Sequence, residues 1–162
     1  MDLFSRKIIS WKLSERADAA MVIDAFKTAY MIRQPRAGLM FHSDRGTQYT
    51  AAAFRMLLDR LNVTQSFSRK GYPYDNACCE SFFKHMKREE IERRHFSDYR
   101  ELHLVLLSYI DSFFNLKRPH ASLDYLTPNE KERIYREEKS EGTVLILQRA
   151  LNSSGSVCFA TG

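Results

Sequence analysis

The chain has 162 residues, of which 44% are hydrophobic and 28% charged, and this composition is typical of one globular domain rather than a disordered chain. Its longest uninterrupted apolar runs, at residues 104–107 and 144–147, are far shorter than the roughly 20 residues that span a bilayer, so we expect no membrane protein. The formal net charge of +5 permits a polyanionic partner without requiring one.

The three cysteines predict neither a disulfide framework nor a metal site. Cys78 and Cys79 are adjacent, Cys158 lies far away, and no CxxC spacing occurs. The first seven residues also lack the apolar stretch of a secretion signal. We therefore expect a protein of a reducing compartment, the cytoplasm.

The first half of the chain alternates strand and helix patterns. Residues 5–13 are short, branched and aromatic, which predicts a strand. Apolar residues at three-and-four spacing then predict a helix over residues 17–33. Residues 39–43 form an apolar run between breakers, which predicts a strand that presents Asp44 to a loop. Thr50 is predicted to cap a second helix.

The second half continues with one strand and two helices. Residues 63–68 alternate like a half-buried strand, a loop follows, and Asp75 or Asn76 caps a third helix that runs to about Arg94. A fourth helix begins at Ser97 and ends before Pro119. This order predicts an α/β domain with a parallel or mixed sheet covered by helices. The residues predicted to face inward are Cys79, Phe82, Phe83 and Met86 on the third helix, and Tyr99, Leu102, Leu106, Tyr109, Ile110 and Phe113 on the fourth.

Two acidic residues are candidates for a shared metal ion. Asp44 follows a predicted strand and Glu80 lies in the first turns of the third helix, with 35 residues between them. Carboxylates that converge from a strand and a helix suit Mg²⁺, which is usually held by a few carboxylates and substrate phosphates. Alternatively, Asp44 opens a turn and Glu80 is an acid favoured by the helix dipole. Composition and periodicity alone favour this second interpretation.

Two lysines share the helix face of Glu80. Lys84 and Lys87 follow it by four and seven positions. A carboxylate that holds metal and two cations that hold phosphates would then lie in one line. The alternative is an exposed ion pair between Glu80 and Lys84, which contributes only ~0.3–0.5 kcal/mol. The spacing alone is compatible with both interpretations, the phosphate-binding lysines and the exposed ion pair.

Two further basic segments could contact nucleic acid. Arg69 and Lys70 lie in an aromatic loop that either touches phosphates and stacks on a base or is simply solvated. Arg118 and His120 follow the fourth helix and either bind phosphate or compensate its dipole. His42 lies in an apolar strand and is expected to be a hydrogen-bonded core residue rather than a metal ligand.

Longer strings carry more information than these spacings. They occur in this order: residues 42–50 (HSDRGTQYT), 66–84 (SFSRKGYPYDNACCESFFK), 118–123 (RPHASL) and Thr127-Pro128. Together they resemble an insertion-sequence transposase of the orfB type with a retroviral-integrase-type catalytic core, over a match from Asp2 to about Tyr135. The resemblance implies an α/β, RNase H-like mixed sheet flanked by helices. It also implies an integrase-core-like catalytic domain at residues 1–135 and leaves a tail of uncertain order at residues 136–162.

The resemblance further implies an activity and its site. It implies a DDE site that binds two Mg²⁺ or Mn²⁺ ions, cuts DNA at element ends and joins the ends to a target. By position, Asp44 resembles the second catalytic acid and Glu80 the third, while Lys84 and Lys87 resemble residues that contact element-end DNA. Because two DNA ends are joined, we expect a homo-oligomer on DNA, associated with the nucleoid when bound.

One part of the family's pattern is missing. The first catalytic Asp of the family precedes an Asp-Leu-Phe-Ser-Arg hairpin, and this chain begins at that hairpin, so about two strands are also expected to be absent. Asp2 matches a structural turn position and not the missing acid. We therefore expect little strand transfer by this chain alone, with the full reading frame supplying the acid. The alternatives are a non-catalytic DNA-binding or multimerising remnant and a nuclease of the same fold.

Overall fold

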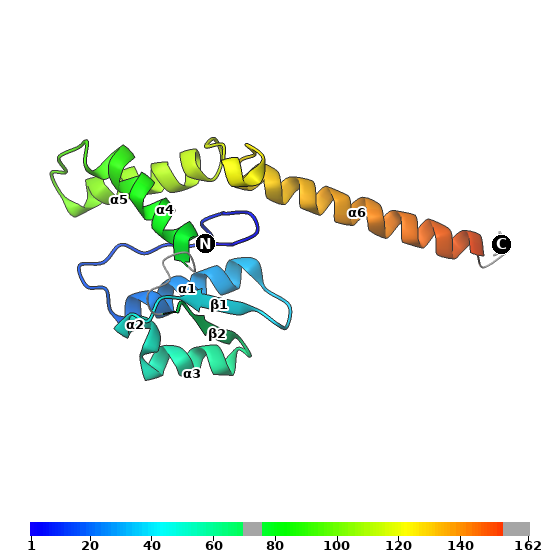
Figure 1. Ribbon diagram of the computed structural model, residues 1–162, viewed down its shortest axis with the longest axis horizontal. Coiled ribbons are helices and arrows are strands. Elements are labelled where there is room, and N and C mark those ends of the chain that lie inside the picture. The colour runs from blue at the N-terminus through cyan, green and yellow to red at the C-terminus, as the bar shows by residue number, and fades with distance from the viewer. Residues whose placement is uncertain (70–75, 154–162) are drawn as a thin grey trace, which may run out of the picture.

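The computed structural model of the protein describes residues 1–69 and 76–153, and the loop position Lys70 lies outside them. Figure 1 shows a lower layer in which α1, α2 and α3 surround a small sheet, an upper layer of helices that begins with α4, and a long helix, α6, that extends away from both. These two layers correspond to two separate hydrophobic clusters.

The lower layer begins with α1 (Ala19–Arg33), close to the predicted helix. Asp18 caps it, because its side chain accepts a hydrogen bond of 2.9 Å from the Met21 N–H. Val22 and Phe26 are its buried residues. Gly38 then turns the chain with φ +92°, a left-handed conformation that glycine adopts readily.

The sheet of the described residues consists of two parallel strands, β1 (Met40–Ser43) and β2 (Thr64–Phe67), in register from Met40 opposite Thr64 to Ser43 opposite Phe67. Two helices connect them, α2 (Thr47–Thr50) and α3 (Ala52–Arg60). Both strands were predicted from their apolar or alternating patterns. The lower core is built from buried residues of α1, α3 and the chain before β2: Val22, Phe26, Phe54, Leu58 and Val63.

Two predictions for the first half are wrong. Thr50 does not cap α3, because it is the last residue of α2 and its hydroxyl donates to the Gly46 carbonyl oxygen at 3.3 Å. Residues 5–13 form no strand. Here the Asn115 side chain replaces a strand neighbour, since its Oδ1 accepts from the Ile8 N–H and its Nδ2 donates to the Ile8 carbonyl, both at 3.0 Å. A sequence pattern cannot distinguish this pairing from a sheet.

The upper layer contains two helices that each continue in π form. They are α4 (Ala77–Met86) with η2 (Lys87–Ile91), and α5 (Tyr99–Leu107) with η3 (Ser108–Phe114). Asp98 caps α5 and accepts from the Glu101 N–H at 2.7 Å. The upper core consists of these buried residues: Ile8, Phe82, Met86, Leu106, Tyr109, Ile110 and Phe114.

Three residues predicted to face inward do not do so. Phe83 is 52% exposed because its neighbour Phe82 occupies the core, and consecutive helical residues point about 100° apart. Phe113 is 41% exposed while Phe114 is buried, since bonding between residues five apart in η3 shifts the inward face by one position. Tyr99 is half-exposed and its hydroxyl donates to the Leu13 carbonyl.

The chain then passes through η4 (Ala121–Leu123) into α6 (Pro128–Ser153). A capping box starts α6: the Thr127 N–H donates to Glu130 Oε2 at 2.8 Å, and the Glu130 N–H donates to Thr127 Oγ1 at 3.2 Å. Residues 136–153, expected to have uncertain order, are thus helical and continuous with the preceding turns. Across the described ranges, no helix has both the length and the apolarity to cross a membrane.

Candidate functional site

Asp44 is exposed at the carboxyl end of β1. Its Oδ1 accepts a hydrogen bond of 2.9 Å from the Gly46 N–H. Asp44 thus opens a turn, which is the alternative role that the sequence predicts for it. The buried Ser43 hydroxyl donates to the Asp44 carbonyl at 2.9 Å. The turn orients the carboxylate and leaves its second oxygen outside this hydrogen bond.

The residues behind Asp44 hold the end of β1 against the end of β2. The His42 ring lies within hydrogen-bond distance of two hydroxyls, with Nδ1 at 3.0 Å from Ser66 Oγ and Nε2 at 3.1 Å from Ser68 Oγ. The Ser68 N–H donates to the Ser43 carbonyl at 2.9 Å. The hydrogen-bonding role predicted for His42 is therefore confirmed. Arg69, the next residue, is exposed at the end of the described segment.

Two residues of this region, Tyr49 and Cys79, have raised pKa values. Burial raises the pKa of Tyr49, and the charge of Asp44 raises that pKa further. Burial also raises the pKa of Cys79, with a smaller contribution of the same sign from Asp44. The Arg6 guanidinium contacts Cys78 Sγ. The first turn of α4, which carries Glu80, is thus joined to the terminal hairpin.

Glu80, Lys84 and Lys87 are all exposed on α4 and the start of η2. Within residues 1–69 and 76–153, Glu80 and Lys84 form no ion pair, although their spacing allows one. The same ranges contain no group of three or more His, Cys, Asp or Glu side chains arranged to hold a metal ion. In the described residues Asp44 and Glu80 are therefore both exposed, and neither belongs to a three-ligand group.

Arg118 and His120 lie against the upper core. Arg118 Nη1 contacts Glu89 Oε2 and donates to the Tyr109 hydroxyl at 3.1 Å. Tyr109 in turn donates to the same Glu89 oxygen at 2.8 Å. The His120 ring packs edge-on against Phe114 at 4.7 Å between centroids, and burial lowers the pKa of His120.

The Glu89 contacts join the two π segments, since Glu89 lies in η2 and Tyr109 in η3. Burial raises the pKa of Glu89, but hydrogen bonds from Arg118 and Tyr109 outweigh it and hold that pKa below its usual range. Glu89 lies in a run of mixed charge, residues 87–94, and such a run is typical of a solvated helix face. No sequence pattern predicts that Glu89 bonds to Tyr109 and Arg118, because these residues lie 20 and 29 positions away along the chain.

Replacing Glu89→Gln should lower the free energy of unfolding by about 1–2 kcal/mol, because Arg118 loses a charged partner in a half-buried place. Urea unfolding would measure this loss. Glu137→Gln is the matched control, since Glu137 pairs with Arg133 in an exposed position on α6 and its loss should change stability little. Equal effects of the two substitutions would contradict a special role for Glu89.

Comparison with protein families gives two matches, both to families described as integrase core domain. The first covers residues 1–73 and the second residues 61–128. Asp44 lies in the first range, and Glu80, Lys84 and Lys87 lie in the second.

Two curated transposases are similar to most of the chain. The transposase for insertion sequence element IS904 of Lactococcus lactis subsp. lactis is 41% identical over 133 residues, which are 82% of this chain and 53% of that protein. The transposase InsF for insertion sequence IS3A of Escherichia coli is 37% identical over 132 residues, 82% of this chain and 46% of that protein. The chain thus spans about half the length of these relatives.

Among solved structures, the catalytic core domain of BIV integrase matches with a TM-score of 0.50 and 21% sequence identity, covering 82% of this chain and 80% of that one. At this identity the likeness concerns the fold, and it confirms the predicted α/β, RNase H-like class.

Proposed function

The chain belongs to the insertion-sequence transposases with an integrase core, and from this premise we propose that it is a catalytic-core part of a DDE transposase. In this proposal it takes part in cutting DNA at element ends and in joining them to a target. Since two ends must be joined, we also propose that more than one copy acts on the DNA.

The observation that supports this proposal most is that both acids matched to the family's site are exposed, one after a strand and one at the start of a helix. Asp44 follows β1 directly, and Glu80 lies in the first turn of α4, with 35 residues between them in sequence. The exposure of both carboxylates keeps them accessible to a ligand from solvent.

The donor set suits a hard divalent cation. Asp44 and Glu80 offer carboxylate oxygens, the ligands that Mg²⁺ and Mn²⁺ prefer. When bound, such ions would supply a nucleophile at neutral pH and stabilise the entering and leaving oxygens of an in-line displacement. Two carboxylates hold two ions less firmly than three, so we expect little strand transfer by this chain alone.

The basic residues of α4 have a separate role in the proposal. Lys84 and Lys87 follow Glu80 on its helix face and would hold the phosphates of DNA beside the carboxylates. Arg69 and Lys70 would contact the backbone from the loop that precedes the helix. Arg118, which is bound to Glu89, would act mainly by fixing η2 and with it the direction of α4.

Lys84→Ala together with Lys87→Ala should weaken duplex DNA binding and lower the slope of log K against log salt concentration by about 2, because two phosphate contacts are lost. Fluorescence anisotropy of a labelled duplex at several salt concentrations would measure the slope. The matched control is Lys12→Ala with Lys27→Ala, which removes the same charge from exposed positions outside α4. An unchanged slope in the α4 variant, or an equal fall in both, would contradict the assigned contacts.

A further inference from the structure

Two aromatic side chains from opposite ends of the sequence form an exposed pair. Phe4 lies in the terminal hairpin and Tyr135 lies on α6, with ring centroids 5.0 Å apart and ring planes at 59°. Phe4 is 50% exposed and Tyr135 is 42% exposed, and the neighbouring Leu3 is 56% exposed. The Phe4–Tyr135 pair therefore offers aromatic surface to solvent.

Lysines flank both rings. Lys131 Nζ lies 5.4 Å from the centre of the Phe4 ring, and Lys139 Nζ lies 5.0 Å from the centre of the Tyr135 ring. Lys131, Tyr135 and Lys139 follow one another at every fourth position, so they form one stripe along α6. We call Phe4, Lys131, Tyr135 and Lys139 the Phe4–Tyr135 patch.

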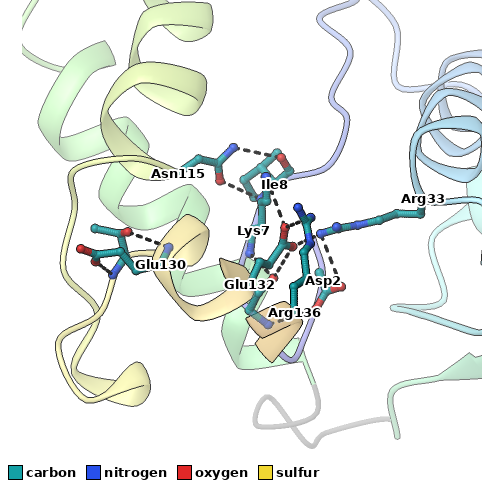
Figure 2. Close-up of polar contacts among 10 residues, drawn as sticks. Asp2, Lys7, Ile8, Arg33, Asn115, Glu130, Glu132 and Arg136 are labelled. Carbon is teal, nitrogen blue, oxygen red and sulfur yellow. Dashed lines mark hydrogen bonds and ion pairs between the residues drawn. The ribbon is translucent and has the colours of Figure 1, made fainter. Parts of the chain in front are cut away.

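A buried carboxylate holds the two halves of this patch together. Glu132, next to Lys131, accepts hydrogen bonds from Ser5 Oγ at 3.0 Å and Lys7 Nζ at 3.3 Å, and both donors follow Phe4 within three residues. Arg33 of α1 and Arg136 of α6 also contact Glu132, as Figure 2 shows. The rings are therefore presented by a fixed support rather than by a loose terminus.

The hairpin is itself fixed by a side chain. Asp2 Oδ1 accepts from the Phe4 N–H at 2.8 Å and from the Ser5 N–H at 3.0 Å, and Asp2 Oδ2 lies 3.7 Å from Arg33 Nη2 (Figure 2). The structural turn role predicted for Asp2 is thus confirmed. These contacts reduce the conformational entropy that Phe4 would lose when a ligand binds.

We propose that the Phe4–Tyr135 patch binds single-stranded DNA, with bases stacked on the rings and phosphates held by the lysines. Aromatic side chains beside a track of basic ones are the combination that binds single strands, because every base offers a flat face for stacking. A duplex hides those faces, so the patch should prefer unpaired strands. This site goes beyond the proposed function, whose phosphate contacts lie on α4, at the start of η2 and in the loop before α4.

The test measures binding of a fluorescent oligothymidylate of about 12 nucleotides and of a labelled duplex to the full chain. Phe4→Leu and Tyr135→Leu keep apolar bulk but remove the stacking face, and each should weaken single-strand binding about tenfold while duplex binding stays within about twofold. Tyr135→Phe should retain single-strand binding. Lys131→Gln with Lys139→Gln should lower the single-strand salt slope by about 1.4, since two phosphate contacts are lost.

Tyr125→Leu is the matched control, because Tyr125 is 75% exposed outside the patch and its loss should leave binding unchanged. Thermal unfolding of each variant checks that the fold is intact. Unchanged single-strand binding in Phe4→Leu and Tyr135→Leu, or equal losses for single strand and duplex, would overturn the proposal. So would a dimer, seen by sedimentation, that dissociates in these variants, because the patch would then be an interface between copies.

The α4 test separates this proposal from the proposed function. If the variant with Lys84→Ala and Lys87→Ala loses duplex binding and keeps single-strand binding, two independent surfaces are present. If it loses single-strand binding as severely as the Phe4→Leu variant, the separate patch is rejected, whatever the duplex result shows.

Discussion

Glu132→Ala should lower the free energy of unfolding by about 3 kcal/mol, because it leaves Arg33 and Lys7 without the carboxylate that compensates their charge in a largely buried place. The Glu132 side chain is 9% exposed, while those of Arg33 and Lys7 are each 28% exposed. Ser5 is fully buried and would lose its hydrogen-bond acceptor as well. Urea unfolding at neutral pH would measure the loss.

The same carboxylate should make stability depend on pH. Burial raises the pKa of Glu132, but the hydrogen bond and charge of Arg33, followed by Lys7 and Ser5, outweigh it and hold that pKa below the ordinary value of 4.5. Because the folded pKa is the lower one, the stabilisation is complete above pH 4.5 and is lost as the pH falls through the folded pKa. Glu132→Gln should therefore show a smaller loss of stability below that pH than the unchanged protein.

Glu138→Gln is the control for both measurements, since Glu138 is exposed two turns further along α6. It should change neither the unfolding free energy at neutral pH nor its decline in acid by a comparable amount. If Glu132→Ala unfolded at the same urea concentration as the control, the carboxylate would not be the link that joins α6 to the hairpin and α1.

Local periodicity predicted the elements that depend on local burial. The helix around Val22 and Phe26 and the two short strands follow directly from their apolar patterns. The starts of α4 and α5 lie within two residues of the predicted ones, but the Asn76 side chain makes no capping hydrogen bond, and Asp75 lies outside the described residues. In each case the residues that pack inward are neighbours along one element. A sequence reports such neighbours because three-and-four spacing or alternation brings them to one face.

Long-range polar contacts could not be predicted in the same way. Asn115 pairs with Ile8 across 107 residues, and Glu132 bonds to Ser5 across 127. Neither contact leaves a periodic signal, so the branched and aromatic composition of residues 5–13 predicted a strand where the Asn115 side chain bonds to Ile8 instead. The π segments have no sequence signal either, so the sequence predicts Phe113 in the core where the structure has Phe114.

For the candidate site, the sequence identified residues but could not show their surroundings. Asp44 has a turn role and a metal role as its two predicted alternatives, and the structure confirms the turn through the Gly46 N–H, while the metal role stays a prediction. Arg118 was a candidate phosphate ligand, yet its guanidinium contacts Glu89 and Tyr109. The difference arises because the identity of a charged side chain does not reveal which opposite charge lies beside it.

Asp44→Asn combined with Glu80→Gln should reduce Mn²⁺ affinity at least tenfold, because both carboxylates proposed to hold the ion are replaced by neutral amides. Isothermal titration calorimetry of the full chain would measure it. The Asp44 substitution is mild for the fold, since an asparagine side-chain oxygen can still accept the Gly46 N–H. Asp24→Asn with Glu92→Gln removes one acid of each type from exposed positions and should leave Mn²⁺ binding unchanged. Identical heats for all three proteins would remove the metal role of Asp44 and Glu80. A DNA-binding remnant without catalysis would then explain the family resemblance better than a transposase core.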